Sequence, residues 1–242
     1  MGIKTIAQIP AVGDGICVVR SHGESEDVFD EIKQAGFEIL DLTCFDVKKV
    51  QSKAIELAKN DYFVIVLGKP EHPEVVAIST NAKKCATNPD NIFVAKNIES
   101  LVTIENKIKS ASKVGVILQT TQTKEFLREV VDYLSNICKI LTVQNTICPS
   151  TTLRQNEAKE LASVSDLMVV VGSKKSANTT HLAELITNIT KTIHIENEDE
   201  LSDFSTLIQK SNKIGITAGA STPDDIINNV YKKIENIIRK DK

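Results

Sequence analysis

Short apolar runs rich in β-branched residues alternate with longer amphipathic stretches along the whole chain. The runs have the length of buried strands, and the longer stretches have helical spacing. Strands are expected over residues 16–20, 62–67, 114–118, 167–171 and 213–217. Helices are expected over residues 26–35, 48–59, 124–135, 154–162, 179–188 and 224–239. This alternation predicts an α/β protein with mostly parallel sheets.

The chain also repeats itself. A shift of 104 residues places Cys44 on Cys148 and, without a gap, Gly68 on Gly172. Each copy consists of a cysteine, a helix, an apolar strand, a glycine loop and a second helix. This cysteine half-unit is present twice, which indicates two copies of one supersecondary unit.

A second half-unit, made of a strand, a small polar loop and a helix, occurs three times, near residues 17–23, 114–121 and 214–223. It alternates with the cysteine half-unit, so one cysteine half-unit is missing and is expected before Met1. Its cysteine should lie roughly 50–60 residues upstream. We therefore predict a partial first domain at 1–42, a second at 43–146 and a third at 147–242. An incomplete first sheet would leave an exposed edge.

The composition is ordinary for a soluble globular protein, with 41% hydrophobic residues, 25% charged residues and a net charge of −3. Lysine and arginine are spread along the chain, so no nucleic-acid surface is indicated. The apolar runs are too short to cross a bilayer, and the start lacks the apolar core of a secretory signal. We expect a cytoplasmic protein with reduced cysteines, because its five cysteines are odd in number and widely spaced.

Cys44 and Cys148 each precede a predicted helix, where backbone N–H groups favour a thiolate. Two repeat-related cysteines brought to one centre could hold a soft metal or an iron–sulfur cluster. The alternative is a pair of buried structural thiols, which is the usual state of an isolated cysteine. The repeat favours the ligand interpretation. Cys17, Cys85 and Cys138 have no counterparts in the repeat and are expected to be structural.

Polar residues gather in the loops expected at the carboxyl ends of the strands, where parallel sheets usually bind ligands. Their hydroxyl, amide and imidazole groups suit an anion such as phosphate. These loops carry His22-Gly23, His72-Pro73-Glu74, Thr120-Thr121, Ser176-Ala177-Asn178 and Ser221-Thr222. The alternative for Thr120, Ser176 and Ser221 is a helix cap. His181 and His194 are expected on a helix and a strand away from these loops, and we give them no role.

Glu74 is the one carboxylate in this set of loops, two residues after His72. A carboxyl group beside a desolvated anion tends to keep its proton, which suits a general acid. The alternative is a solvated loop glutamate.

Taken together, these segments resemble the 4-hydroxy-3-methylbut-2-enyl diphosphate reductase (LytB-type) family. The matching motifs occur in the family's order from about residue 10 to the end. They are Arg-Ser-His-Gly (20–23), Asp-Leu-Thr-Cys (41–44), His-Pro-Glu-Val (72–75), Gln-Thr-Thr (119–121), Ile-Cys-Pro-Ser-Thr-Thr-Leu-Arg-Gln (147–155), Val-Gly-Ser-Lys-Lys-Ser-Ala-Asn-Thr (171–179) and Gly-Ile-Thr-Ala-Gly-Ala-Ser-Thr-Pro (215–223).

The resemblance implies three-layer αβα domains in a pseudo-threefold array around a [4Fe–4S] cluster, with the first domain incomplete. It implies that Cys44 and Cys148 are two of three cluster ligands, and that Glu74 is the proton source. The diphosphate would be bound by His22, His72, Thr120, Ser176, Asn178 and Ser221. The implied reaction is reductive dehydroxylation to isopentenyl and dimethylallyl diphosphate, with electrons from a ferredoxin- or flavodoxin-like donor.

Three departures from the family pattern stand out. The N-terminal motif Gly-Phe-Cys-x-Gly-Val, which carries the third cluster cysteine, is absent from this chain. Phe45-Asp46 follows the second cysteine where proline is common, and Ala177 replaces a serine. The alternative function is therefore a non-catalytic, phosphate-binding α/β protein without the cluster. A nucleotide-binding protein is disfavoured, because no Gly-x-Gly-x-x-Gly or Gly-x4-Gly-Lys-Ser/Thr loop is present.

Overall fold

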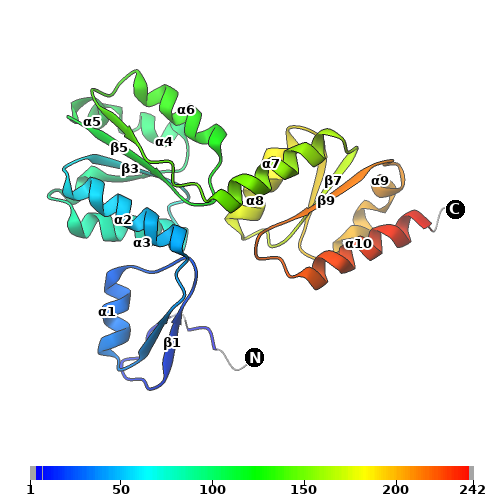
Figure 1. The fold of residues 1–242 in the computed structure, drawn as a ribbon, viewed down its shortest axis with the longest axis horizontal. Coiled ribbons are helices and arrows are strands. Elements are labelled where there is room, and N and C mark those ends of the chain that lie inside the picture. Colours follow the sequence, from blue (N-terminus) through cyan, green and yellow to red (C-terminus); the bar gives the residue numbers. More distant parts are fainter. Residues whose placement is uncertain (1–3, 7, 240–242) are drawn as a thin grey trace. The chain divides into compact units, whose positions relative to one another are not determined.

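The computed structural model describes residues 4–6 and 8–239, and the chain divides into two compact units, Met1–Ile147 and Cys148–Lys242 (Figure 1). The first unit contains β1 (Ile16–Val19), α1 (Glu26–Gln34), β2 (Glu38–Asp41), α2 (Phe45–Lys59), β3 (Phe63–Leu67), α3 (Pro73–Cys85), η1 (Pro89–Asn91), β4 (Ile92–Ala95), α4 (Ile98–Val102), α5 (Glu105–Ser110), β5 (Val114–Leu118), α6 (Lys124–Ser135) and β6 (Leu141–Val143). The second contains α7 (Pro149–Ser163), β7 (Leu167–Val171), α8 (Ala177–Thr187), β8 (Lys191–Ile195), η2 (Glu198–Phe204), α9 (Ser205–Gln209), β9 (Ile214–Ala218) and α10 (Asp224–Arg239).

All strand pairs in the described residues are parallel, which confirms the predicted α/β class. The main sheet of the first unit has the order β4-β3-β5-β6, and the sheet of the second has the order β8-β7-β9. The central strands β3 and β7 pair with their neighbours in the same register. Leu67 pairs with Ala95 and Leu118, while Val171 pairs with Ile195 and Ala218.

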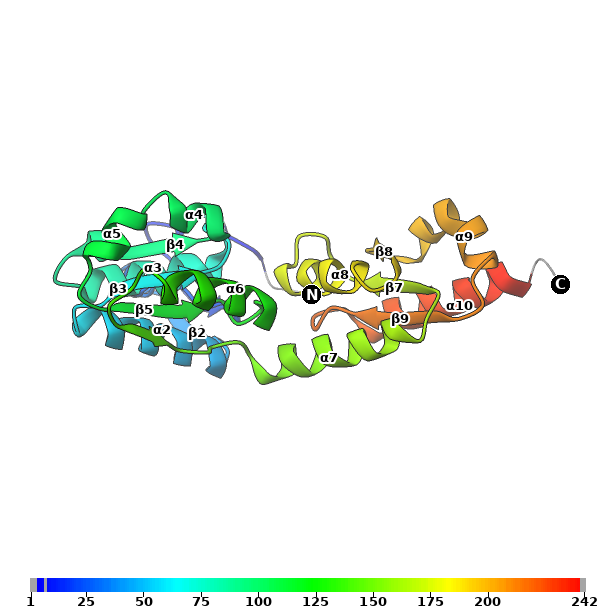
Figure 2. The same cartoon turned by 90° about the horizontal axis from the view of Figure 1, so that it is seen from above.

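Helices cover both faces of each main sheet, because alternate residues of a strand point to opposite sides. In the second unit, Val169 packs into a cluster with residues of α9 and α10, and Val170 packs into a cluster with residues of α7 and α8. Figure 2, seen from above, shows α7 running alongside β9 and α8 lying near β7. The first unit repeats this plan around β3, with α4, α5 and α6 on one face and α2 and α3 on the other.

The strand β1 forms a separate two-stranded sheet with β2 in the described residues. Two of its apolar side chains are open to solvent, with Ile16 62% exposed and Val18 40% exposed, whereas Val19 is buried. The strand β5, which is held between β3 and β6, is buried along its whole length. Helices on both faces of the main sheet account for the burial of β5, whereas β1 lies in a sheet of two strands.

The predicted repeat is confirmed inside the two units. Cys44 and Cys148 each immediately precede a helix with nearly the same backbone angles, φ −56° and ψ 140° against φ −61° and ψ 134°. The N–H groups of Gly68 and Gly172 donate to equivalent carbonyls at 3.0 and 2.9 Å. The division at 1–42, 43–146 and 147–242 and the pseudo-threefold array remain predictions. Residues 1–3, 7 and 240–242 of those domains lie outside the described residues.

The five predicted strands and six predicted helices are all present, most within one to three residues of the expected bounds. The expectation missed the strands β2, β4, β6 and β8, which all lie at an edge of their sheets in the described residues. Within the described part of the chain, no helix is long and apolar enough to cross a membrane.

Candidate functional site

The central feature of the first unit is the buried carboxyl group of Glu74, which is 1% exposed. Glu74 lies in the first turn of α3, just after β3, and Thr120 follows β5. Because β3 and β5 are parallel neighbours, these two loops meet at one edge of the sheet. The Thr120 N–H donates to Glu74 Oε1 at 2.7 Å, and its hydroxyl donates to Oε2 at 2.9 Å. Thr120 therefore binds the carboxyl group and is not a helix cap, a role that Thr123 fills for α6.

Burial raises the pKa of Glu74, and the two hydrogen bonds from Thr120 offset part of that rise. Desolvation penalises the charged carboxylate, whereas donors aimed at its oxygens stabilise it. Glu74 therefore holds its proton to higher pH than a solvated glutamate. This is the property required of a general acid.

Two histidines lie near this carboxyl, with His72 bonded to the Glu74 backbone and His22 against the His72 ring. His72 is the residue before α3, and its Nδ1 accepts from the Glu74 N–H at 3.2 Å. Since Nδ1 is an acceptor, the neutral ring carries its proton on Nε2 and can donate there. The ring centroids of His22 and His72 are 5.2 Å apart, at an interplanar angle of 80°.

His22 follows β1, and its pKa is lowered by burial and by the charge of Arg20. The ring is therefore neutral near pH 7. Its Nδ1 is buried and has no hydrogen-bond partner within the described residues. Arg20, His22, His72 and Glu74 thus form one group at the carboxyl edge of the first unit, with neutral imidazoles beside a carboxyl that resists ionisation.

The predicted metal ligands lie at the start of α2 and of α7. Cys44 is exposed, and its N–H donates to Ser21 O at 3.0 Å, which places it beside the loop that carries His22. Cys148 is half-buried at the equivalent position of the second unit. Helix N-termini favour the thiolate that binds iron, so the two residues fit an iron–sulfur cluster as ligands. Across the described residues, no cluster of three or more His, Cys, Asp or Glu side chains is close enough to hold a metal ion.

The second unit carries the other predicted anion ligands. Ser176 caps α8, where its hydroxyl accepts from the Thr179 N–H at 3.5 Å. Asn178 stands where the first unit has Glu74, and its buried Nδ2 has no partner in the described part of the chain. Ala220 stands where the first unit has Thr120, so the hydroxyl that would reach Asn178 is missing. Ser221 is exposed in the loop before α10.

Two residues near these loops were not predicted. Gln119, which is fully buried, accepts from the Lys69 N–H at 3.3 Å and donates to Thr121 Oγ1 at 3.1 Å. His194 was placed away from the loops, and that expectation is wrong: its Nε2 lies 2.9 Å from the carbonyl oxygen of Gly172. The error arose because His194 is in the middle of a strand, where sequence does not reveal which loop its ring reaches.

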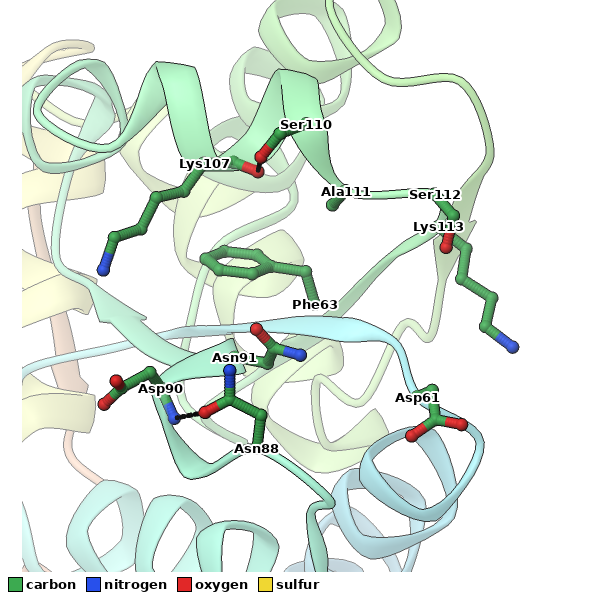
Figure 3. Close-up of a pocket in the computed structure, with 10 residues that line it drawn as sticks. All are labelled: Asp61, Phe63, Asn88, Asp90, Asn91, Lys107, Ser110, Ala111, Ser112 and Lys113. Carbon is green, nitrogen blue, oxygen red and sulfur yellow. Dashed lines mark hydrogen bonds between the residues drawn. The ribbon is translucent and has the colours of Figure 1, made fainter.

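A cavity of about 430 Å³ lies at the opposite end of the first unit, at the amino ends of β3, β4 and β5 (Figure 3). Its polar groups serve local turns. Asn88 accepts from the Asp90 N–H at 3.1 Å, and the Ser110 hydroxyl donates to the Lys107 carbonyl at 2.9 Å. Because Glu74, Thr120 and the histidines lie at the carboxyl ends of the strands, this cavity is separate from the candidate site.

Comparison with known proteins identifies the family. A family model described as LytB protein matches residues 1–235. The 4-hydroxy-3-methylbut-2-enyl diphosphate reductase of Geotalea uraniireducens (strain Rf4) is 38% identical over 243 residues, covering 100% of this chain and 82% of that protein. The enzyme of the same name from Clostridioides difficile (strain 630) is 35% identical over 237 residues, covering 98% and 81%.

Solved structures agree. The structure of (E)-4-hydroxy-3-methyl-but-2-enyl diphosphate reductase, the terminal enzyme of the non-mevalonate pathway, matches with a TM-score of 0.63 at 33% identity, over 96% of this chain and 79% of that one. The E-1-hydroxy-2-methyl-but-2-enyl-4-diphosphate reductase of Plasmodium falciparum shares the fold, with a TM-score of 0.79 at 24% identity over 90% and 66% of the two chains. The chain therefore belongs to the LytB family.

Proposed function

We propose that this chain is a cytoplasmic 4-hydroxy-3-methylbut-2-enyl diphosphate reductase, acting in the last step of the methylerythritol phosphate route to isoprenoids. The reaction takes two electrons and two protons. The allylic C–O bond breaks, the hydroxyl leaves as water, and the carbon skeleton gains one hydrogen to give isopentenyl or dimethylallyl diphosphate. The observation that carries this proposal is the buried Glu74 carboxyl, held by Thr120 beside two neutral histidines.

In this proposal, protonated Glu74 donates its proton to the leaving hydroxyl oxygen. Burial raises the pKa of the carboxyl and so favours its protonated form, and Thr120 fixes its orientation. The neutral imidazoles of His22 and His72 donate hydrogen bonds to the substrate diphosphate through Nε2. Thr120, Ser176, Asn178 and Ser221 complete the diphosphate ligands. The unpartnered Nδ2 of Asn178 supports this role, because a buried donor gains most from a new acceptor.

Cys44 and Cys148 would hold a [4Fe–4S] cluster as thiolates. When bound, the cluster would supply the two electrons, which it would take from a ferredoxin- or flavodoxin-like donor. The three-domain division is part of the same proposal, with the first domain ending at residue 42 and the third beginning at 147.

The test compares Glu74→Gln with the wild type after anaerobic cluster reconstitution. Glutamine keeps the shape and can accept from the Thr120 N–H, but it has no proton to transfer. We expect substrate affinity by calorimetry to stay within about twofold, and kcat to fall by about 10²- to 10⁴-fold. Glu71→Gln is the matched control, since Glu71 is an exposed carboxylate in the same loop, and it should leave both unchanged.

Equal losses of affinity and turnover in Glu74→Gln would assign Glu74 a structural role and contradict its role as the acid. A reconstituted wild type that binds the diphosphate without reducing it would contradict the reductase function itself.

A further inference from the structure

The turn of residues 172–176, which leads from β7 to α8, is held mainly by β8 and the segment after it. His194 Nε2 lies 2.9 Å from Gly172 O. The Lys174 N–H donates to Glu196 Oε1 at 2.8 Å, and the Lys174 ammonium pairs with Glu200 at 2.5 Å. The Glu196 N–H in turn donates to Glu200 Oε1 at 2.9 Å. At the start of the turn, His194 is thus the residue of β8 whose side chain bonds to the turn backbone; we call such a side chain an anchor.

The equivalent turn in the first unit is held from the other side of its sheet. There, Gln119 reaches across from the end of β5 and accepts from the Lys69 N–H at 3.3 Å. The second unit has Gly219, without a side chain, at the position of Gln119, and from that side of the sheet the Thr222 hydroxyl donates instead to Val171 O at 3.1 Å. Conversely, Val94 occupies the place of His194 in the first unit, and it has no donor. The two units therefore use different anchors for the same turn.

The Gly172 anchor matters because of the backbone at that residue. Gly172 has φ +139°, a conformation that side-chain-bearing residues rarely adopt, and it is buried. From there the turn closes through the Ser176 N–H, which donates to Ser173 O at 3.0 Å, and Ser176 then caps α8. A donor on the Gly172 carbonyl fixes the peptide plane at the start of the turn. The directions of Ser176 and Asn178 depend on that plane.

We propose that His194 is a positioning residue for diphosphate binding, which acts by donating from Nε2 to the Gly172 carbonyl and so orienting the Ser176–Asn178 segment. This inference rests on the proposed function, since it assumes that Ser176 and Asn178 bind the diphosphate. The imidazole donates at Nε2 in its neutral and protonated forms alike, so the effect does not require a change of charge.

The experiment uses two variants of the full chain. His194→Leu removes the donor and puts an apolar side chain in its place. His194→Gln instead places an amide N–H close to the position of Nε2. In His194→Leu we expect faster amide hydrogen exchange over residues 173–180, unchanged exchange in β7, and KM raised about three- to tenfold with kcat within twofold. His194→Gln should restore both exchange and KM. Thr192→Val is the matched control on the same strand, because the Thr192 hydroxyl bonds only locally to Thr190 O.

Unchanged exchange in His194→Leu would overturn the inference. Faster exchange with an unchanged KM would also overturn it, because His194 would then serve the fold alone. If His194→Gln fails to rescue while its thermal unfolding matches the wild type, the Nε2 donor is not the cause and the inference fails. Hydrogen exchange needs neither cluster nor substrate. Lack of substrate turnover by the wild type would therefore refute the proposed function separately.

Discussion

Replacing Thr120 by valine isolates the hydroxyl that bonds to the buried acid. Valine has nearly the same shape, and position 120 is only 6% exposed, so the change removes the 2.9 Å bond to Glu74 Oε2 with little change in packing. The backbone bond from the Thr120 N–H to Oε1 remains. The two hydrogen bonds lower the pKa of Glu74 against the larger effect of burial, so losing one of them raises that pKa further.

The size of the effect follows from the difference between the two protonation states. A hydrogen bond to a charged group contributes about 1.5–3 kcal/mol, whereas one between neutral groups contributes about 0.5–1.5 kcal/mol. Thr120→Val therefore disfavours the carboxylate over the acid by about 1–1.5 kcal/mol, which is about tenfold in the ionisation equilibrium. Activity that requires the protonated acid should persist to higher pH, even if the plateau rate falls.

The assay is the pH dependence of kcat/KM under anaerobic conditions. Thr123→Val is the control, because it removes a threonine hydroxyl that caps α6 and accepts from the Phe126 N–H at 3.2 Å. It should cost about 1 kcal/mol of stability and leave the pH profile in place. The fall of kcat/KM at alkaline pH is the part of the profile assigned to Glu74. If this fall does not shift in Thr120→Val, or shifts equally in Thr123→Val, that assignment is refuted.

Two further predictions rest on the same site. Because burial raises the pKa of Glu74, the native state loses stability as pH rises above the ordinary glutamate value and through the raised native value. The free energy of unfolding of Glu74→Gln, measured by denaturation, should therefore exceed that of the wild type by an amount that grows from pH 4.5 to pH 8. A difference in unfolding free energy that stays constant with pH would contradict the buried acid. Arg20→Gln should raise the pKa of His22 in an NMR titration while leaving it below 6.5, because burial is the larger cause. Lys59→Gln, at the far end of α2, should not move it.

The central strands could be predicted because burial on both faces requires continuous apolar runs, as in Leu167–Val171. The edge strands could not. The strand β6 has three residues, and its Val143 is 37% exposed, so its sequence looks like a loop. The repeat placed Cys44 and Cys148 at equivalent helix starts, since a constant shift preserves local geometry.

The sequence was enough to predict which residues form the candidate site, but not which of them contact one another. Sequence placed Glu74 among anion-binding loops, but its burial depends on Thr120, which is 46 residues away and reaches it only because β3 pairs with β5. Ser176 turned out to cap a helix, as the alternative interpretation held, while Thr120 did not. His194 was missed because its partner, Gly172, lies in the turn after the neighbouring strand β7, 22 residues away in the sequence.

The comparison of Glu74 and Thr120 with Asn178 and Ala220 has a consequence for redesign. Within one repeated scaffold, the two units differ both at the acid and at the hydroxyl that supports it, so the chemistry belongs to a pair of loops and not to a single position. Transplanting the acid as Asn178→Glu alone would bury a carboxyl with no hydroxyl beside it. A working graft would also need Ala220→Thr. A redesign of this scaffold should accordingly change the two loops together.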